Sequence, residues 1–373
     1  FGDNQMSFKN FFADKTILVT GHTGFIGSWL TLWLKLLGSN VIGFSLNYPT
    51  KPSLFQKLNL EGKIHHHIGD INDIESIKII LKKYKPEIVF HLAAQALVKQ
   101  SYESPLSTLQ TNIMGTANIL EAIRETDSVK NCIVMTSDKC YKNIETLDAY
   151  TEDDPLGGND PYSASKGAAE IVVESYKKSF FQDNYDNQTK ISTIRAGNVI
   201  GGGDWSPNRI IPDCIEKFSQ NKSVQIRHPN AIRPFQYVLE PISGMFCLAE
   251  KMWENESFDE AWNFGPSLSD DPQKIHIIVE KIIKKFGSGT WQDISDKKSF
   301  KESNLLLLNS QKAQNRLGWH PIFDIDNAIS ETVDWYKKYH DNPKEIESYS
   351  EKCIESYMKK AKEIKIKWAS ENN

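Results

Sequence analysis

The sequence of 373 residues has few cysteines, and they suggest neither disulfides nor a metal site. There are five, an odd number, and no two have Cys-x-x-Cys spacing. This pattern favours reduced thiols and a cytoplasmic location. The chain also lacks an apolar run of the ~20 residues that a membrane-spanning helix requires. Its first residues do not resemble a signal peptide, so we expect no membrane partner.

Neither sign of charge dominates the sequence. The formal net charge is −4, and acidic residues are interleaved with the lysines. A charge this small excludes bulk electrostatic attraction to nucleic acid or to an anionic membrane. The hydrophobic content of 39% and the charged content of 25% are ordinary for a globular protein. A chain of this length is typical of one large domain with a smaller lobe.

Short apolar runs alternate with helical patterns along the first two hundred residues. The runs are continuously apolar, which is typical of parallel strands buried on both faces. The sequence therefore predicts an α/β fold, a Rossmann-type doubly wound parallel sheet. We expect strands at residues 16–20, 41–44, 67–70, 88–92, 132–136 and 191–195. We expect helices over residues 29–37, 73–84, 112–124 and 162–181.

A glycine-rich turn follows the first expected strand and opens the first helix. Gly21 permits a tight turn, Gly24 lets the backbone approach a pyrophosphate, and Gly27 allows close packing of helix on strand. The N-terminus of such a helix presents N–H groups to phosphates. The same glycines could form a turn without a ligand, but their place between strand and helix favours a dinucleotide.

The second expected strand lacks the acidic residue that usually binds the adenosine ribose. It ends in Phe44-Ser-Leu-Asn47, and the nearest cation is Lys51. This segment therefore does not favour NAD over NADP. Asp70, at the end of the third expected strand, is a candidate for an adenine contact. Alternatively, Asp70 caps the helix over residues 73–84.

The composition changes after Asn198, which suggests how the domains are divided. Residues 200–236 are rich in Gly, Pro, Asp and Arg, and residues 267–345 mix helices with short strands. We predict an NAD-binding domain over 14–200, to which 237–266 return. The smaller C-terminal substrate-binding lobe would comprise 201–236 and 267–345, followed by a charged, solvated helical tail over 346–373.

Tyr162 and Lys166 are four residues apart and share one face of a helix. A nearby ammonium would lower the pKa of Tyr162 towards neutrality, and its phenolate could then take a proton from a substrate hydroxyl. A Tyr-x-x-x-Lys pattern alone is typical of a solvated helix face. Ser137 strengthens the assignment because it lies at the carboxyl end of an expected strand, where such sheets bind ligands.

These motifs, in this order, resemble the extended short-chain dehydrogenase/reductase superfamily over roughly residues 14–270. The motifs are Gly21-x-x-Gly24-x-x-Gly27, His91-Leu-Ala-Ala-Gln95, Thr111-Asn-x-x-Gly-Thr116 and Tyr162-x-x-x-Lys166. Longer and more specific strings resemble CDP-glucose 4,6-dehydratases. They are Thr136-Ser-Asp-Lys-Cys-Tyr141, Asp153-Asp-Pro-Leu-Gly-Gly158, Arg195-Ala-Gly-Asn-Val-Ile-Gly-Gly-Gly-Asp-Trp205 and Arg233-Pro-Phe-Gln-Tyr-Val-Leu-Glu-Pro241.

The resemblance implies an enzyme that retains NAD through turnover and makes a 4-keto-6-deoxy sugar from a nucleotide-sugar. In such a reaction C4 is oxidised, water is lost across C5 and C6, and hydride returns to C6. Two other functions stay open. An NAD-dependent nucleotide-sugar epimerase, or a different nucleotide-sugar 4,6-dehydratase, would also use Tyr162 and Lys166. A non-catalytic dinucleotide sensor could use the same fold.

Asp138 and Lys139 follow Ser137 directly and are the candidates for the elimination of water. The related dTDP-glucose enzymes have glutamate at the second position, whereas this sequence has lysine. Asp138 could be the acid, with Lys139 as the base or as a cation that stabilises the enolate, or the roles could be reversed. A solvated pair in a loop is the alternative.

The remaining site residues are assigned to cofactor or substrate. Arginine suits a pyrophosphate because its planar guanidinium binds phosphate in a bidentate manner, although each arginine could instead form a surface ion pair. The further cofactor candidates are Thr23, Phe25, Ile26, Ile71 and Ala93. The substrate candidates are Gln95, Thr136, Asn198, Arg209 and Arg233. We assign no metal, since consecutive residues 65–67 of a strand cannot converge on one ion.

The resemblance also implies a homodimer. In this superfamily the helix carrying Tyr162 usually joins one from the Asn112 region in a four-helix contact between subunits. An apolar stripe on that helix could form the contact, or it could face only the subunit's own sheet. The stripe consists of Ala164, Ala168, Ile171, Val172 and Tyr176.

Overall fold

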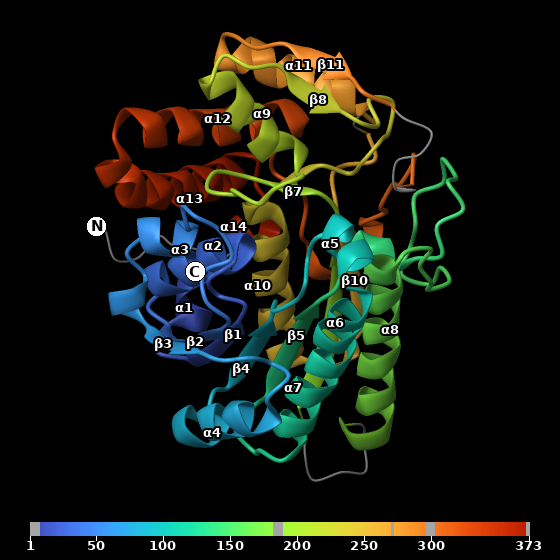
Figure 1. The fold of residues 1–373 in the computed structure, drawn as a ribbon. Helices are drawn as coiled ribbons and strands as arrows, with labels where there is room; N and C mark the ends of the chain where they lie inside the picture. The colour runs from blue at the N-terminus through green and yellow to red at the C-terminus, as the bar shows by residue number, and fades with distance from the viewer. Residues whose placement is uncertain (1–7, 182–188, 270–271, 296–302, 371–373) are drawn as a thin grey trace.

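A seven-stranded parallel sheet forms the centre of the protein in the computed structural model, which describes residues 8–181, 189–269, 272–295 and 303–370 (Figure 1). The strand order is β10-β6-β5-β4-β1-β2-β3. The strands are β1 (Thr16–Thr20), β2 (Asn40–Ser45), β3 (His65–Ile68), β4 (Ile88–His91), β5 (Asn131–Met135), β6 (Lys190–Ala196) and β10 (Ala261–Phe264). The expected α/β fold with a Rossmann-type parallel sheet is confirmed.

Successive strands are added towards one edge of the sheet up to β3 and towards the other edge from β4 onward, so the strand order reverses between β1 and β4. The chain runs outward from β1 to β3, returns to β4 beside β1, and continues outward to β10. Every neighbouring pair of these strands is parallel. Ligands of such sheets bind at the carboxyl ends of the strands, next to this reversal. The end of β1, at Thr20, is therefore where a cofactor site is expected.

Helices cover both faces of the sheet, as expected for a doubly wound fold (Figure 1). On one face, Trp29 and Trp33 of the first long helix pack with Phe246 in the largest apolar cluster. On the other face, Ile77, Ile119 and Val173 belong to a second cluster. The first face carries α2 (Phe25–Leu36) and α10 (Leu239–Glu254), and the second carries α4 (Ile74–Tyr84), α7 (Gly115–Arg124) and α8 (Pro161–Tyr176).

A smaller lobe lies above the sheet in Figure 1, beyond the carboxyl end of β6. The strands β7 (Val199–Ile200) and β9 (Gln236–Tyr237) pair in parallel close to the junction. A second parallel pair joins β8 (Val224–Ile226) to β11 (Trp291–Asp293). The lobe's helices are α9 (Ile210–Ser219), α11 (Ile275–Phe286) and α12 (Ile325–Asp341). Residues 270–271 and 296–302 of the predicted lobe lie outside the described residues.

Shorter helices complete the chain. They are α1 (Lys9–Phe12), α3 (Leu54–Lys57), α5 (Val98–Glu103), α6 (Pro105–Leu109) and α14 (Lys367–Ser370). The 3-10 turns are Glu61–Lys63, Asp138–Cys140, Glu256–Phe258 and Pro343–Glu345, and π turns span Gln110–Met114, Lys177–Phe181 and Ala313–Leu317. The π turn at Gln110–Met114 carries Asn112, which contributes to the site described below.

The expectation that the C-terminal tail is a solvated helix is wrong. Helix α13 (Ile346–Glu363) buries one face, which includes Ile354, Tyr357 and Ala361. The Tyr357 hydroxyl donates a hydrogen bond to Glu240 Oε2 in α10 (2.6 Å). The many lysines and glutamates of the tail occupy the opposite face, so its composition concealed an amphipathic pattern. Residues 371–373 lie outside the described residues.

The carboxyl of Glu240 lies in the core, and this location leads to a prediction on stability. Its Oε1 accepts hydrogen bonds from the Ile322 and Phe323 amides (2.9 Å each). Burial raises the pKa of Glu240 from 4.5 to about 7, although hydrogen bonds from Tyr357 and the two amides oppose the rise. The folded state therefore holds this proton more tightly than the unfolded chain does. The stability it contributes is complete below pH 4.5 and is lost as the pH rises through about 7.

We expect Glu240→Gln to reduce the loss of Tm between pH 5 and pH 8, because glutamine stays uncharged throughout this range. Thermal unfolding followed by circular dichroism at each pH measures the effect. Glu363→Gln, at an exposed position of α13, is the matched control and should follow the parent protein. If Glu240→Gln loses Tm with pH as steeply as the parent, the pKa of Glu240 in the folded protein is not raised above that in the unfolded chain.

Candidate active site

The glycine-rich turn between β1 and α2 has the shape that a bound dinucleotide requires. Gly21 has a φ of 74°, and a Cβ at this position would lie 2.7 Å from the Ala93 nitrogen. Helix α2 begins at Phe25, and within the described part of the chain no side chain caps it. The first-turn N–H groups, including those of Phe25 and Ile26, can therefore bind phosphate. These residues fit a dinucleotide cofactor.

Gly27 provides a test of this turn. A Cβ at Gly27 would lie 2.2 Å from the Gly21 carbonyl oxygen, which is backbone and cannot easily move aside. We expect Gly27→Ala to push the glycine-rich turn away from α2. Because this displaces the backbone N–H groups that would bind the pyrophosphate, NAD affinity should fall by about tenfold or more. Isothermal titration calorimetry measures this affinity. Gly62→Ala, where an added Cβ meets nothing within 4 Å, should bind like the parent, and equal affinity of both variants would contradict the expectation.

Hydroxyl groups occupy the end of β2, where an acidic residue is common. The Thr23 and Ser45 side chains are hydrogen-bonded to each other (2.8 Å). Asp70, after β3, accepts hydrogen bonds at Oδ1 from the Asn72 amide and side chain (2.9 Å each). The alternative that Asp70 caps the following helix is wrong, because Asp73 is the residue that caps α4. Asp70 is exposed and remains a candidate for adenine.

Two other cofactor candidates lie close to this turn. The Ile71 side chain is buried in the second apolar cluster, so only its backbone is suited to a ligand. The Ala93 amide donates a hydrogen bond to Thr20 Oγ1 (3.2 Å) at the end of β1. Its backbone is also the nearest neighbour of Gly21. Ala93 therefore borders the expected cofactor position through backbone atoms, whereas the Ile71 carbonyl accepts a hydrogen bond from Asn118 Nδ2 (2.9 Å).

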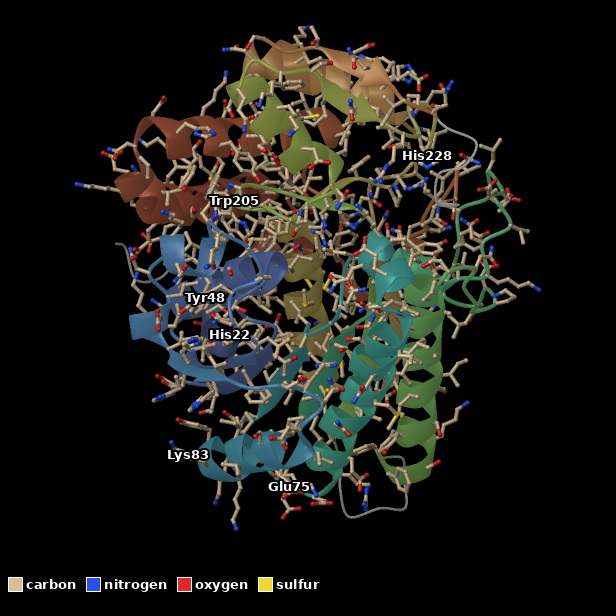
Figure 2. All side chains as sticks on the ribbon, in the orientation of Figure 1. His22, Tyr48, Glu75, Lys83, Trp205 and His228 are labelled. Carbon is tan, nitrogen blue, oxygen red and sulfur yellow. The ribbon has the colours of Figure 1, made fainter. Side chains whose placement is uncertain are left out.

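His22 in this turn is buried and contacts the half-buried His66, a contact that was not predicted from the sequence. His22 Nε2 and His66 Nδ1 are 2.7 Å apart. Tyr48 stacks on the His66 ring, and Figure 2 shows Tyr48 near His22 beside the first strands. Burial, with a smaller effect of His66, lowers the pKa of His22 to about 3, so His22 is neutral at physiological pH. His67 instead contacts Tyr84 (2.9 Å), on the opposite face of β3.

The structure brings Ser137, Asp138 and Lys139 together after β5. Ser137 Oγ donates a hydrogen bond to Asp138 Oδ1 (2.9 Å), and Lys139 Nζ lies 3.2 Å from the same oxygen. Asp138 is 1% exposed, and its Oδ2 has no hydrogen-bond partner among the described residues. The expectation of a solvated loop pair is therefore wrong for Asp138. A buried, unsatisfied carboxylate oxygen is costly unless it has a functional partner.

Tyr162 and Lys166 lie on the buried side of α8, next to this segment. The Ser137 hydroxyl is close enough to Tyr162 to act on the pKa of its phenol. Lys166 Nζ faces the Met135 carbonyl oxygen at 3.4 Å, and burial lowers the pKa of Lys166 to about 8. The expected lowering of the Tyr162 pKa is wrong for the ligand-free protein. Burial raises it to about 12, and the opposing effects come from Ser137 and Arg209.

Two substrate candidates have side chains that are already engaged. The side-chain nitrogen of Gln95, Nε2, donates hydrogen bonds to the Leu97 carbonyl oxygen (3.0 Å) and to Thr108 Oγ1 (2.9 Å). Gln95 Oε1 accepts from the Leu97 amide (2.6 Å). The Thr136 hydroxyl donates to Glu170 and to the Ile194 carbonyl. In this structure both side chains hold the site together.

The other three substrate candidates lie in segments that follow β6 along the chain: Asn198 before β7, Arg209 before α9 and Arg233 before β9. Asn198 Oδ1 is buried without a hydrogen-bond partner in the described residues. Arg209 forms an ion pair with Asp204 (3.0 Å), and its charge acts on Tyr162. Arg233 donates to the carbonyl oxygens of Ile232 and Ser303 and borders a cavity of about 380 Å³. Each has polar atoms suited to a substrate.

An asparagine that anchors the backbone was not among the predicted site residues. Asn112 Oδ1 accepts a hydrogen bond from the backbone N–H of Gln95 (2.8 Å), and Asn112 Nδ2 donates one to Ser165 Oγ (2.8 Å). Ser165 in turn donates to the Tyr162 carbonyl (2.6 Å). Asn112 thus joins the loop after β4 to the helix that carries Tyr162. Its position in the Thr111–Thr116 motif was the available signal.

The comparisons with known proteins agree with this geometry. Residues 18–332 match the family model described as GDP-mannose 4,6 dehydratase. The chain is 44% identical over 334 residues to CDP-glucose 4,6-dehydratase of Salmonella typhimurium, covering 89% of this chain and 93% of that protein. It is 25% identical to dTDP-glucose 4,6-dehydratase of Xanthomonas campestris, over 86% of this chain and 93% of that protein.

Solved structures share the fold at lower identity. One is UDP-glucose 4-epimerase of Thermotoga maritima with UDP-glucose, at 24% identity and a TM-score of 0.74, covering 87% of this chain and 99% of that one. Another is dTDP-glucose 4,6-dehydratase of Streptomyces venezuelae with NAD, at 20% identity and a TM-score of 0.75. It covers 88% of this chain and 97% of that chain. Both likenesses concern the fold alone.

Proposed function

Because the chain belongs to the GDP-mannose 4,6 dehydratase family, we propose that it is an NAD-dependent dehydratase acting on CDP-glucose. The product would be CDP-4-keto-6-deoxyglucose. The nucleotide follows from the relative at 44% identity, which carries the name CDP-glucose 4,6-dehydratase. The reaction class has independent support from Asp138, described below.

The turn after β1 would hold the cofactor. The backbone of Gly21, Gly24 and the first turn of α2 would bind the pyrophosphate. Asp70 would contact the adenine, and Lys166 the nicotinamide ribose. Bound NAD would supply a hydride acceptor and, in its oxidised form, a positive charge that favours the Tyr162 phenolate.

The protein's own side chains would move the protons. Tyr162 would take the proton of the sugar 4-hydroxyl, with Ser137 bound to the same oxygen. Asp138 would give a proton to the departing 6-hydroxyl. Lys139 would remove the C5 proton; with the roles reversed, Asp138 would take the C5 proton and the Lys139 ammonium would protonate the departing hydroxyl. Arg209, Arg233 and Asn198 would bind the pyrophosphate and the sugar.

The observation that carries the proposal is the unsatisfied carboxylate oxygen of Asp138. It lies in a buried segment that also holds Ser137, which is close enough to Tyr162 to act on its pKa. An epimerase needs Tyr162 and Ser137 but no acid and base for the loss of water. An acid–base pair at this position therefore favours elimination over epimerisation.

Mass spectrometry of a substrate panel tests the proposal. The protein is incubated with CDP-glucose, dTDP-glucose, UDP-glucose and GDP-mannose in the presence of NAD. We expect CDP-glucose to lose the mass of one water. If another nucleotide-sugar alone loses water, the cytidine assignment is wrong. A product of unchanged mass but altered sugar would show an epimerase, and no conversion of any substrate would favour a sensor.

We also propose that the predicted domains correspond to separate roles. Residues 14–200, with 237–266, would bind NAD, because β10 joins the sheet and α10 covers it. Residues 201–236 and 267–345 would bind the nucleotide-sugar. All five cysteines are buried and none forms a disulfide, which supports a reducing, cytoplasmic location. No described helix is long and apolar enough to cross a membrane.

A homodimer is the last part of the proposal. Ile171 of α8 is 60% exposed, and Met114, on the neighbouring π turn, is 54% exposed. Val172 and Tyr176 of the same stripe instead pack partly against the subunit's own core. Exposed apolar side chains on two adjacent elements are suited to a second copy. Sedimentation should give a dimer at micromolar concentration, and a monomer would contradict this part.

A further inference from the structure

Glu170 is a buried carboxylate one helical turn after Lys166 that the proposed chemistry does not use. It is 4% exposed and accepts hydrogen bonds from β6 and from the residue that follows β5. The Thr193 hydroxyl donates to its Oε2 (2.7 Å), as does the Arg195 guanidinium (2.8 Å). The Thr136 hydroxyl donates to Oε1. Glu170 therefore connects α8 to residues of β6 and to the residue that follows β5.

These contacts join the two halves of the active site. Thr136 directly precedes Ser137, whereas Tyr162 lies two helical turns before Glu170 on α8. Helix α8 also packs on the 3-10 turn Asp138–Cys140, which directly follows Ser137. A side chain that joins them at a second point constrains the position of both. Glu170 provides that point.

Arg195 anchors the carboxylate to the rest of the sheet. Its guanidinium also donates to the Tyr141 hydroxyl (2.9 Å) and to the Glu152 carbonyl (3.0 Å). The Tyr141 hydroxyl donates to Asn263 Oδ1 in β10 (2.6 Å). The ion pair is thus fixed by partners on several elements and has little freedom to move.

We propose that Glu170 is a positioning residue that keeps Lys166 in its ammonium form and aligns α8 with the Thr136–Ser137 segment. This inference rests on the proposed function, in which Lys166 contacts the cofactor. It assigns to Glu170 a role in cofactor binding as well as in the structure.

The surroundings of Lys166 support this role. Lys166 is 5% exposed, and burial lowers its pKa to about 8, with Glu170 opposing the change. The other titratable groups that act on it are Cys140, after β5, and His91 of β4. Burial raises the pKa of the Cys140 thiol and lowers that of His91 to about 3, so both are neutral at pH 7. The carboxylate of Glu170 is therefore the charge that favours the ammonium.

The test measures NAD affinity by calorimetry from pH 6 to pH 9.5. For the parent, affinity should fall as Lys166 loses its proton, near pH 8. For Glu170→Gln, which keeps the shape but not the charge, the fall should occur about one pH unit lower, since a neighbouring opposite charge has about this effect. The kcat for CDP-glucose should also fall by roughly tenfold or more, with KM little changed.

Matched variants separate this role from a general loss of structure. Thr193→Val removes one hydrogen bond to the carboxylate but keeps its charge, and should retain the parental midpoint. Glu170→Asp should restore most of the midpoint. Since Glu170→Gln leaves Arg195 buried without a counter-ion, the double variant Glu170→Gln/Arg195→Met is measured if the single one does not fold.

The outcomes distinguish this inference from the proposed function. A parental midpoint in Glu170→Gln, or equal midpoints in Arg195→Met and the double variant, would overturn the role of Glu170, while normal NAD binding by the parent would leave the proposed function intact. An equal shift in Thr193→Val would also overturn it, because charge would not be the cause. Absence of NAD binding by the parent at every pH would instead contradict the proposed function.

Discussion

Replacement of Lys139 by methionine is expected to slow the loss of water by about 10²–10⁴-fold, the usual contribution of an acid–base group. Lys139 Nζ lies 3.2 Å from Asp138 Oδ1. The 3-10 turn that holds both residues packs against α8, the helix that carries Tyr162. Methionine is a flexible side chain of similar length, but it can neither accept the C5 proton nor stabilise an enolate. Oxidation at C4, which uses Tyr162 and Ser137, should be spared.

Two measurements resolve the steps for this variant. Quenching the reaction with borodeuteride should mark accumulated 4-keto sugar with deuterium at C4. Exchange of the C5 hydrogen in heavy water, followed by mass spectrometry, should be slow. Lys142→Met is the matched control, because Lys142 is an exposed lysine three residues along the chain. If Lys139→Met loses water at a near-parental rate, Lys139 is only a neighbour of the site.

Replacement of Tyr162 by phenylalanine is expected to stop the reaction earlier. The variant loses only the hydroxyl, so the buried ring can still pack. Without that hydroxyl no group takes the proton of the 4-hydroxyl, and C4 oxidation should fall by about 10²–10⁴-fold. Borodeuteride should then find no accumulated 4-keto sugar, which distinguishes this variant from Lys139→Met.

The controls for Tyr162→Phe address folding and position. Its Tm should stay close to that of the parent, because the substitution removes one hydroxyl and leaves the buried ring in place. Tyr84→Phe also loses one hydroxyl contact, to His67, but lies away from the site and should keep full activity. Oxidation of C4 at the parental rate by Tyr162→Phe would mean that another group is the base.

Much of the sheet could be predicted from local sequence. Strands β1, β2, β4 and β5 lie in largely apolar runs next to turns, and the predicted bounds of β1, residues 16–20, agree with the structure. Strand β10 has only four residues and was expected merely as part of a returning segment. Its place at the sheet edge depends on pairing with β6, which is a contact between distant parts of the chain.

The tail shows why composition alone misled the prediction. Residues 346–363 are rich in lysine and glutamate, yet Ile346, Cys353, Tyr357 and Ala361 fall on one helix face. That face docks on the protein, where Glu240, far away in the sequence, accepts the Tyr357 hydrogen bond. A periodicity count would have found the face, but not its partner.

The site was predicted in part. The sequence indicated that Ser137, Asp138, Tyr162 and Lys166 would meet, because motif spacing places them at the carboxyl edge of a parallel sheet. The predicted direction of the Tyr162 pKa shift was wrong, because the effect of burial exceeds the opposing effects of Ser137 and Arg209. Glu170 was missed because its partners, Thr193 and Arg195, are brought to it by the fold.

The central claim is that the sugar undergoes an internal transfer of hydrogen coupled to the loss of water. CDP-glucose carrying deuterium at C4 tests it most directly. After complete conversion, the product should have lost one water and should carry the deuterium at C6, as mass spectrometry and NMR would show. Product that carries no deuterium at C6, or deuterium that passes to unlabelled NAD added to the solution, would contradict the account.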